Sequence, residues 1–254
     1  MKKILAILCL LPLCTSAQQD SVLSGVYNWN EPDAITGNKI SSVVLLEGKT
    51  HDFKWMQLTA NSLNPSPVRI KQTVPKNQEQ LIIVKTGILQ IGLGDSSFAL
   101  NAGSVVVLIP GEKILLNSSQ PCSFYVMKYQ SKSPKNIERA KQNGGSFLKF
   151  WEAIPFKPNN NGGGRRDFFE QPTAMQKRFE MHVTTLKEGL RSHDPHTHRA
   201  EEIILMIEGD TEMQIGEKFA KGKTGDFFYL GSNVLHGIRN VGSKPCMYFA
   251  IQFE

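Results

Sequence analysis

Residues 189–209 read GLRSHDPHTHRAEEIILMIEG and contain three side chains that can bind a metal ion together, namely His196, His198 and Glu202. Each is separated from the next by an even number of positions, which places side chains on one face of an extended chain. A helix would also bring His198 and Glu202 together, because they are four positions apart. Pro195 before this pair and the isoleucine-rich run after it favour a loop that leads into a β-strand.

A fourth candidate ligand, His236, lies beyond a second strand that is bounded by glycine. Three neutral imidazoles and one carboxylate leave one or two open positions on a six-coordinate ion. This donor set suits one divalent Mn, Fe, Ni, Co or Zn ion per chain, and the sequence does not select among them. Five of the six histidines lie in the second half of the chain, and the sixth is His51.

The N-terminus has the pattern of a secretory signal peptide over residues 1–17. Two lysines precede an apolar run over residues 4–13, and small residues follow it, so we expect cleavage after Ala17 and a periplasmic or secreted protein. The run is too short for a transmembrane helix. A lipid anchor on Cys14 is the competing interpretation.

The composition favours an exported globular protein that does not bind nucleic acid. The net charge is +6, and the basic residues are scattered rather than gathered into a stripe. No later stretch is long and apolar enough to span a bilayer. Signal cleavage leaves only Cys122 and Cys246, which we interpret as two buried small side chains rather than a disulfide.

Short apolar runs separated by Gly, Asn, Asp and Pro predict an all-β fold, a sandwich or a barrel. The runs span residues 53–63, 80–87, 88–91, 104–109 and 123–129. Before them, residues 18–36 resemble an extended arm with Tyr27 and Trp29 as docking aromatics. Such an arm fits either exchange between the subunits of a homodimer or bracing of one domain by the other within a monomer.

An internal repeat shows that the chain holds two copies of one β domain. Residues 79–87 (EQLIIVKTG) match residues 201–209 (EEIILMIEG), and PCSFY at 121–125 matches PCMYF at 245–249. The predicted divisions are the arm at 18–36, the first barrel at 37–130, a connector at 131–171 and the second barrel at 172–254. Within the connector, residues 135–142 have the composition of a short helix.

The second copy resembles the cupin superfamily, and the repeat makes the whole chain similar to a bicupin. The first cupin motif consists of Gly, His-any-His, Glu and Gly, and the second of Gly, Pro-any-Gly, His and Asn. The matching residues are Gly189, His196, His198, Glu202, Gly209, Gly225, His236 and Asn240. One extra residue follows Gly189, and Gly231 and Asn233 replace the Pro and Gly of a turn, where both are tolerated.

The resemblance implies two tandem antiparallel cupin-type (jelly-roll) β-barrels, with a ligand pocket inside the barrel. In the first copy, the motif positions hold Val74, Lys76, Gln80 and Ile114. These four side chains do not make a comparable site, so we interpret the first barrel as a metal-free copy that supports or covers the second.

Four further residues are candidates for catalysis or substrate contact. Arg178, Glu180 and His182 alternate along one face of a strand, which either lines the pocket as an acid–base and anion-binding set or faces solvent. His193 is either a substrate contact or an exposed loop side chain. Glu201 should point away from Glu202 and is interpreted as a surface carboxylate.

The site favours a metal-dependent enzyme that acts on a small polar substrate, whether sugar-derived, carboxylated or aromatic. The superfamily includes dioxygenases, isomerases, lyases and hydrolases, and the fold does not choose among them. The alternative is a non-catalytic periplasmic carrier or sensor that uses the metal to hold its ligand. A hydrolase similar to the ureidoglycine aminohydrolases is a third hypothesis, although the order of ligands in those bicupins differs.

Overall fold

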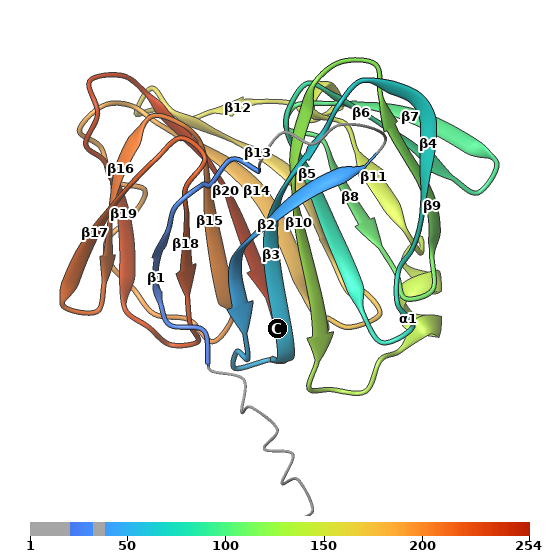
Figure 1. The fold of residues 1–254 in the computed structure, drawn as a ribbon. Coiled ribbons are helices and arrows are strands. Elements are labelled where there is room, and N and C mark those ends of the chain that lie inside the picture. The colour runs from blue at the N-terminus through green and yellow to red at the C-terminus, as the bar shows by residue number, and fades with distance from the viewer. Residues whose placement is uncertain (1–20, 33–38) are drawn as a thin grey trace, which may run out of the picture.

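The structure is a computed structural model that describes residues 21–32 and 39–254. Within these residues, antiparallel strands form two β-barrels, one after the other along the chain (Figure 1). The predicted signal peptide over residues 1–17, with Cys14, lies outside the described residues, as do parts of the predicted arm at 18–36. No helix in the described part has the length and apolarity that crossing a membrane requires.

The described strands of the first barrel form a six-stranded sheet, in the order β11-β8-β5-β10-β3-β2, and a four-stranded sheet, in the order β4-β9-β6-β7. The larger sheet contains β2 (Ile40–Gly48), β3 (Phe53–Leu63), β5 (Glu79–Thr86), β8 (Val105–Leu108), β10 (Cys122–Ser131) and β11 (Phe147–Lys149). The smaller sheet contains β4 (Ser66–Thr73), β6 (Ile88–Leu93), β7 (Ser96–Asn101) and β9 (Lys113–Ser118).

The described strands of the second barrel form a seven-stranded sheet, in the order β1-β18-β15-β20-β14-β13-β12, and a three-stranded sheet, in the order β17-β16-β19. The larger sheet contains β1 (Gly25–Tyr27), β12 (Lys157–Pro158), β13 (Gly164–Gln171), β14 (Phe179–Leu186), β15 (Glu201–Glu208), β18 (Phe227–Leu230) and β20 (Cys246–Phe253). The smaller sheet contains β16 (Asp210–Ile215), β17 (Lys218–Lys223) and β19 (His236–Asn240).

The order of the strands confirms the predicted repeat, because β5 lies between β10 and β8 just as β15 lies between β20 and β18. A glycine with positive φ follows each of the two strands, Gly87 at +75° and Gly209 at +85°. A Cβ atom at Gly87 would lie 2.2 Å from the Pro121 carbonyl oxygen, and one at Gly209 would lie 2.7 Å from Cys246 Cβ. The repeated glycine is therefore a requirement of the fold. Cys122 and Cys246 are buried and unpaired, as predicted.

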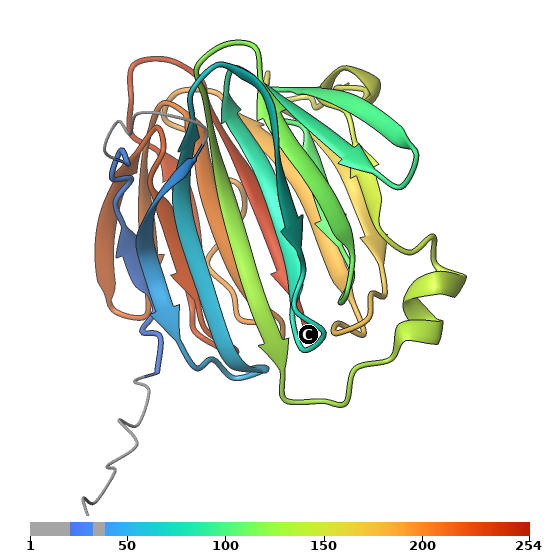
Figure 2. The ribbon, with the colours of Figure 1, turned by 45° about the vertical axis from the view of Figure 1, so that its right-hand side comes forward.

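The largest cluster of buried apolar side chains lies between the two barrels, and each barrel also has a smaller core inside it. Alternation along each strand explains this division, since Ile83 and Leu205 face the other barrel while Val84 and Ile204 face inward. Phe53 of the first barrel stacks on Phe253 of the second, with ring centroids 4.9 Å apart. Figure 2 shows the two large sheets as neighbouring layers.

The N-terminal arm crosses to the second barrel, where β1 pairs with β18. Tyr27 stacks on Phe227 at 5.2 Å, and Trp29 meets the edge of Tyr125 at 4.7 Å. Both predicted docking aromatics thus pack against other rings, and the arm braces one barrel with the other inside a single chain.

The stretch between the predicted domains contributes strands to both barrels. It contains the predicted short helix as α1 (Ile137–Gln142), and a 3₁₀ turn at Trp151–Ala153. Strand β11 pairs with β8 of the first barrel, and β13 pairs with β14 of the second. This segment therefore completes sheets as well as joining domains.

A buried glutamate at the start of β15 connects the second barrel to a turn of the first by hydrogen bonds. Glu201 accepts a hydrogen bond from Thr50 Oγ1 at 2.7 Å. It accepts two more from the backbone N–H groups of His51 and Asp52, both at 2.9 Å. The prediction that Glu201 is a surface carboxylate is wrong, because the direction away from the pocket leads into the first barrel and the side chain is fully buried.

The equivalent residue of the first barrel, Glu79, reaches across in the opposite direction. It is fully buried, and its Oε2 atom accepts a hydrogen bond from the Met175 N–H at 2.7 Å. Burial raises the pKa of Glu79 to about 7, although the hydrogen bonds and the charge of Arg139 oppose the shift. Each barrel thus places one carboxylate against a turn of the other.

The substitution Glu79→Gln tests this contact through the pH dependence of stability. The pKa of Glu79 is higher in the folded chain than its ordinary value of 4.5, so the native state binds more protons and loses stability as the pH rises towards and through 7. We expect the free energy of unfolding of the wild type to fall relative to Glu79→Gln, by up to about 3 kcal/mol between pH 4 and pH 8. Urea titrations at each pH measure this difference.

The matched control is Glu138→Gln on helix α1, where the carboxylate is 75% exposed. Its unfolding curves should follow those of the wild type at every pH. If the curves of Glu79→Gln also stay parallel to those of the wild type, the buried carboxylate does not titrate in this range and the account of the contact is contradicted.

Candidate metal centre

Two segments far apart in the sequence place the predicted ligands side by side. His196 and His198 lie in the loop before β15, Glu202 is the second residue of that strand, and His236 begins β19. The backbones of His196 and His236 exchange two hydrogen bonds of 3.0 Å as an antiparallel bridge. The loop that leads into a strand is therefore present as predicted, and the bridge brings in the fourth residue.

The three imidazoles converge, with one nitrogen of each lying within 4.8 Å of the others. The ring centroid of His236 lies 4.8 Å from that of His196 and 4.8 Å from that of His198. Glu202 Oε2 lies 3.1 Å from His236 Nε2 and 3.6 Å from His198 Nε2. The three histidines therefore converge, and Glu202 lies beside two of them.

Backbone carbonyls orient two of the rings. His198 Nδ1 lies 2.9 Å from the Ala200 oxygen, and His236 Nδ1 lies 2.8 Å from the Val234 oxygen. A carbonyl only accepts, so each Nδ1 carries the proton and each Nε2 keeps its lone pair. Both Nε2 atoms are buried and have no well-directed hydrogen bond within the described residues. Two buried imidazole nitrogens that face a carboxylate can act with it as ligands of a bound cation.

The electrostatics of the cluster also fit a cation. Burial alone would raise the pKa of Glu202, but the proximity of His198 and His236 outweighs it and holds the pKa well below 4.5. The nearby carboxylate of Glu202 raises the pKa of His198, whereas burial lowers that of His196. A buried carboxylate that stays ionised among imidazoles supplies the charge that a divalent ion would neutralise.

A cavity of about 390 Å³ opens from the cluster into the barrel. Its size is within the usual range for small-molecule sites. Strands β14, β15 and β20 contribute His182, Ile204 and Tyr248 to its wall. Lys157 and Arg165, from the segment that precedes β14, line it as well.

Of the three polar side chains predicted on β14, His182 lines the cavity, whereas Arg178 and Glu180 do not belong to its lining. Glu180 is buried, and His182 Nδ1 lies 2.7 Å from Glu180 Oε1. Arg178 does not line the cavity and reaches the centre only through Gln252. The catalytic roles of Arg178, Glu180 and His182 remain predictions.

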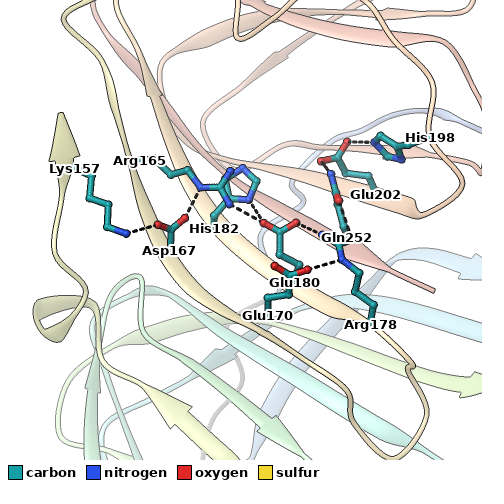
Figure 3. A network of polar contacts seen from close by, with 10 residues as sticks. All are labelled: Lys157, Arg165, Asp167, Glu170, Arg178, Glu180, His182, His198, Glu202 and Gln252. Atoms are coloured by element: carbon teal, nitrogen blue, oxygen red, sulfur yellow. Dashed lines mark hydrogen bonds and ion pairs between the residues drawn. The ribbon is translucent and has the colours of Figure 1, made fainter. Parts of the chain in front are cut away.

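A continuous line of polar contacts connects the far wall of the cavity with the candidate ligands (Figure 3). It includes four residues that the sequence did not single out. The contacts join Lys157 to Asp167 (2.8 Å), Asp167 to Arg165, Arg165 to Glu180 (2.8 Å), Glu180 to Arg178 (3.0 Å), Arg178 to Gln252 (3.1 Å) and Gln252 to Glu202 (3.2 Å).

His193 lies at the mouth of the cavity, exposed, with its ring 4.2 Å from that of His196. Its Nδ1 atom lies 3.0 Å from the Asp194 oxygen. It is not part of the converging group, so the structure is compatible with the predicted substrate contact and does not add it to the ligands.

The first barrel has a different interior at the equivalent positions. Val74 and Ile114 are buried apolar side chains, and Gln80 stands where the second barrel has Glu202. Among the described residues, the convergent histidines are those of the second barrel. The motif residues that could hold a metal therefore belong to the C-terminal barrel.

Comparisons with known proteins agree with this architecture. Residues 182–252 match the family model described as a cupin domain. The sequence comparison with curated proteins gives no match. The second barrel thus matches a cupin domain, and the similarity in fold to solved structures extends over both barrels.

Three solved structures illustrate the shared fold. The protein Ylba from E. coli has a TM-score of 0.68 at 14% identity, with 94% of this chain and 95% of that chain covered. An oxalate decarboxylase from Lactobacillus farciminis, in complex with formate, has a TM-score of 0.65 at 13% identity (92% and 88% covered). Oxalate decarboxylase from Bacillus subtilis, studied for its Mn(II) centres, has a TM-score of 0.64 at 13% identity (93% and 79% covered).

Removal of one imidazole tests the assignment of the ligands. We expect chelator-washed and remetallated wild-type protein to hold one metal ion per chain, and His198→Ala to hold almost none, because three donors remain and Glu202 loses a partner. Elemental analysis by mass spectrometry gives the stoichiometry. The control His193→Ala removes a neighbouring ring outside the cluster and should keep one ion. A wild-type stoichiometry near zero or near two contradicts a single site.

Gln252 provides a second test, since its amide connects Glu202 to Arg178. The substitution Gln252→Met keeps the length of the side chain and removes both hydrogen bonds. We expect the affinity for metal to fall by about 10- to 100-fold, as it does when groups that orient ligands are lost. Competition with a chromogenic chelator measures the affinity, and an affinity within about twofold of wild type would show that this contact does not orient Glu202.

Proposed function

We propose that the protein is a metal-dependent enzyme that acts on a small carboxylated substrate inside the second barrel. The observation that carries the proposal is that one cavity combines the converging histidines and Glu202 with two cationic side chains, Lys157 and Arg165. A bound divalent ion would supply a Lewis acid with one or two open positions. Arg165 and Lys157 would orient a carboxylate, because a guanidinium or ammonium group binds it with charge-assisted hydrogen bonds.

His182 is the candidate for moving a proton. Burial favours the neutral form of Glu180, but the hydrogen bond from His182 and the charges of Arg165 and Arg178 hold the pKa of Glu180 below 4.5. An ionised Glu180 accepts the proton of His182 Nδ1, so Nε2 is left to accept a proton in the cavity. Arg178 and Glu180 act through other residues and are positioning groups in this proposal.

The comparisons support a carboxylated substrate without fixing it. Two of the similar structures are oxalate decarboxylases, named for a small dicarboxylate, and one of the two is a complex with formate. At 13% identity these proteins show the fold alone, so the reaction on this chain stays open among decarboxylation, oxygenation, isomerisation and hydrolysis.

Export is the second part of the proposal, and it rests on the signal-peptide pattern of residues 1–17. N-terminal sequencing of the protein recovered from the periplasm or the medium should begin at Gln18. Recovery from the cytoplasm with residues 1–17 intact would contradict export and leave the proposal for the site unchanged.

The enzyme hypothesis is tested with a panel of small mono-, di-, oxo- and sugar-derived carboxylates and the Mn(II)-loaded or Fe(II)-loaded protein. Oxygen uptake and product mass spectra are followed under air. We expect turnover of at least one compound, with kcat lowered by about 10²- to 10⁴-fold in His182→Ala at unchanged metal content, as for loss of a general acid or base.

His51→Ala is the matched control, because this exposed histidine of the first barrel lies outside both barrel cavities. Its kcat should equal that of the wild type. A ligand that raises the melting temperature and is never converted would favour the non-catalytic carrier instead. Unchanged kcat in His182→Ala would remove that residue from the mechanism.

A further inference from the structure

The first barrel also encloses a cavity, of about 380 Å³, on the inner side of strands β5 and β10. Its wall is mixed, and the apolar side chains include Ile82, Phe124 and Val126. The polar groups are amides and hydroxyls, together with the ammonium group of Lys128. No carboxylate or imidazole belongs to the described lining, so the chemistry differs from that of the second barrel.

The side chain of Gln80 indicates that this cavity binds a ligand. Its side chain lines the cavity and is only 7% exposed. Within the described residues it makes no side-chain hydrogen bond, in contrast to Asn61 nearby, whose amide donates to Thr59 and Phe124 and accepts from Ser42. The amide atoms of Gln80 are not among the fully buried polar atoms, so they can be reached from the cavity. Such a group is usually retained where something else satisfies it.

Lys128 indicates that a ligand bound beside Gln80 would carry a negative charge. It is directly opposite Gln80 in the pairing of β10 with β5, so the two side chains lie on one face. One carboxylate, that of Glu47, interacts with Lys128 electrostatically, but it is exposed and receives hydrogen bonds from Trp55 and Gln57. The cavity therefore has a donor amide and a cation side by side, together with apolar side chains elsewhere in its wall.

We propose that the first barrel binds a small organic monocarboxylate without a metal ion. The carboxylate would accept hydrogen bonds from Gln80 and Lys128, and an apolar chain or ring would pack against Phe124 and Ile82. Val74 and Ile114, at the positions of the metal ligands, leave room for carbon rather than for a coordinated ion. This barrel is thus a second binding site, independent of the function proposed for the other.

Benzoate is the probe, and benzyl alcohol is its uncharged counterpart. Saturation-transfer NMR titrations use the full-length chain after chelator treatment, so that the second barrel holds no metal ion. We expect saturable binding of benzoate, with benzyl alcohol weaker by about tenfold or more, since a hydrogen bond to a charged group is about twice as strong as a neutral one. Gln80→Leu and Lys128→Met should each weaken benzoate by about tenfold.

Two further variants locate the binding and control for folding. His198→Ala should bind benzoate as the wild type does, because its change lies in the other barrel. Gln80→Leu should unfold at or above the temperature of the wild type without benzoate, because the Gln80 amide makes no hydrogen bond within the described chain that the substitution could remove. The proposal is overturned if benzoate does not bind, if only His198→Ala weakens it, or if Gln80→Leu lowers the melting temperature, as loss of a satisfied amide would.

Discussion

Two neighbouring carboxylates at the start of β15 point to opposite faces of one strand, and the rest of the structure depends on this division. Glu201 is buried against the turn of the first barrel and accepts its backbone N–H groups. Glu202 is buried among the imidazoles of the second barrel. Because successive side chains of a strand alternate, the contact that joins the barrels also fixes the position of the ligand next to it. The position of Glu202 in the candidate metal centre therefore depends on the interface between the two barrels.

The two barrels have a similar arrangement of strands and differ in the side chains of their interiors. Gly87 and Gly209, Cys122 and Cys246, and Glu79 and Glu201 occupy corresponding places, and each repeats a constraint of folding or of the interface. The inward-facing positions have diverged, since Gln80 and Lys128 correspond to Glu202 and Gln252. The second barrel has side chains that can coordinate a cation. The first barrel has hydrogen-bond donors for an anion, and apolar side chains beside them. This asymmetry gives one architecture two kinds of interior.

Local patterns in the sequence are sufficient for the two barrels and for the convergence of His196, His198, Glu202 and His236, because even spacing and apolar runs determine direction on a strand. The same patterns do not predict the burial of Glu201. Alternation gives the direction in which a side chain points, but it does not show that the first barrel lies in that direction. Strand β13 falls within the predicted connector, so the sequence does not reveal Arg165 and Asp167 as part of the site. Strands β4 and β7 are mostly exposed, so a pattern of buried apolar residues does not reveal them.

The central claim is that the second barrel alone holds a metal ion, at those four side chains. An anomalous difference map, from crystals of chelator-washed protein reloaded with Mn(II), tests it most directly. The account predicts one strong peak per chain, bounded by the Nε2 atoms of His198 and His236, a nitrogen of His196 and the carboxylate of Glu202, and no peak in the first barrel. A peak beside Gln80, or none within coordination distance of the four side chains, would contradict it.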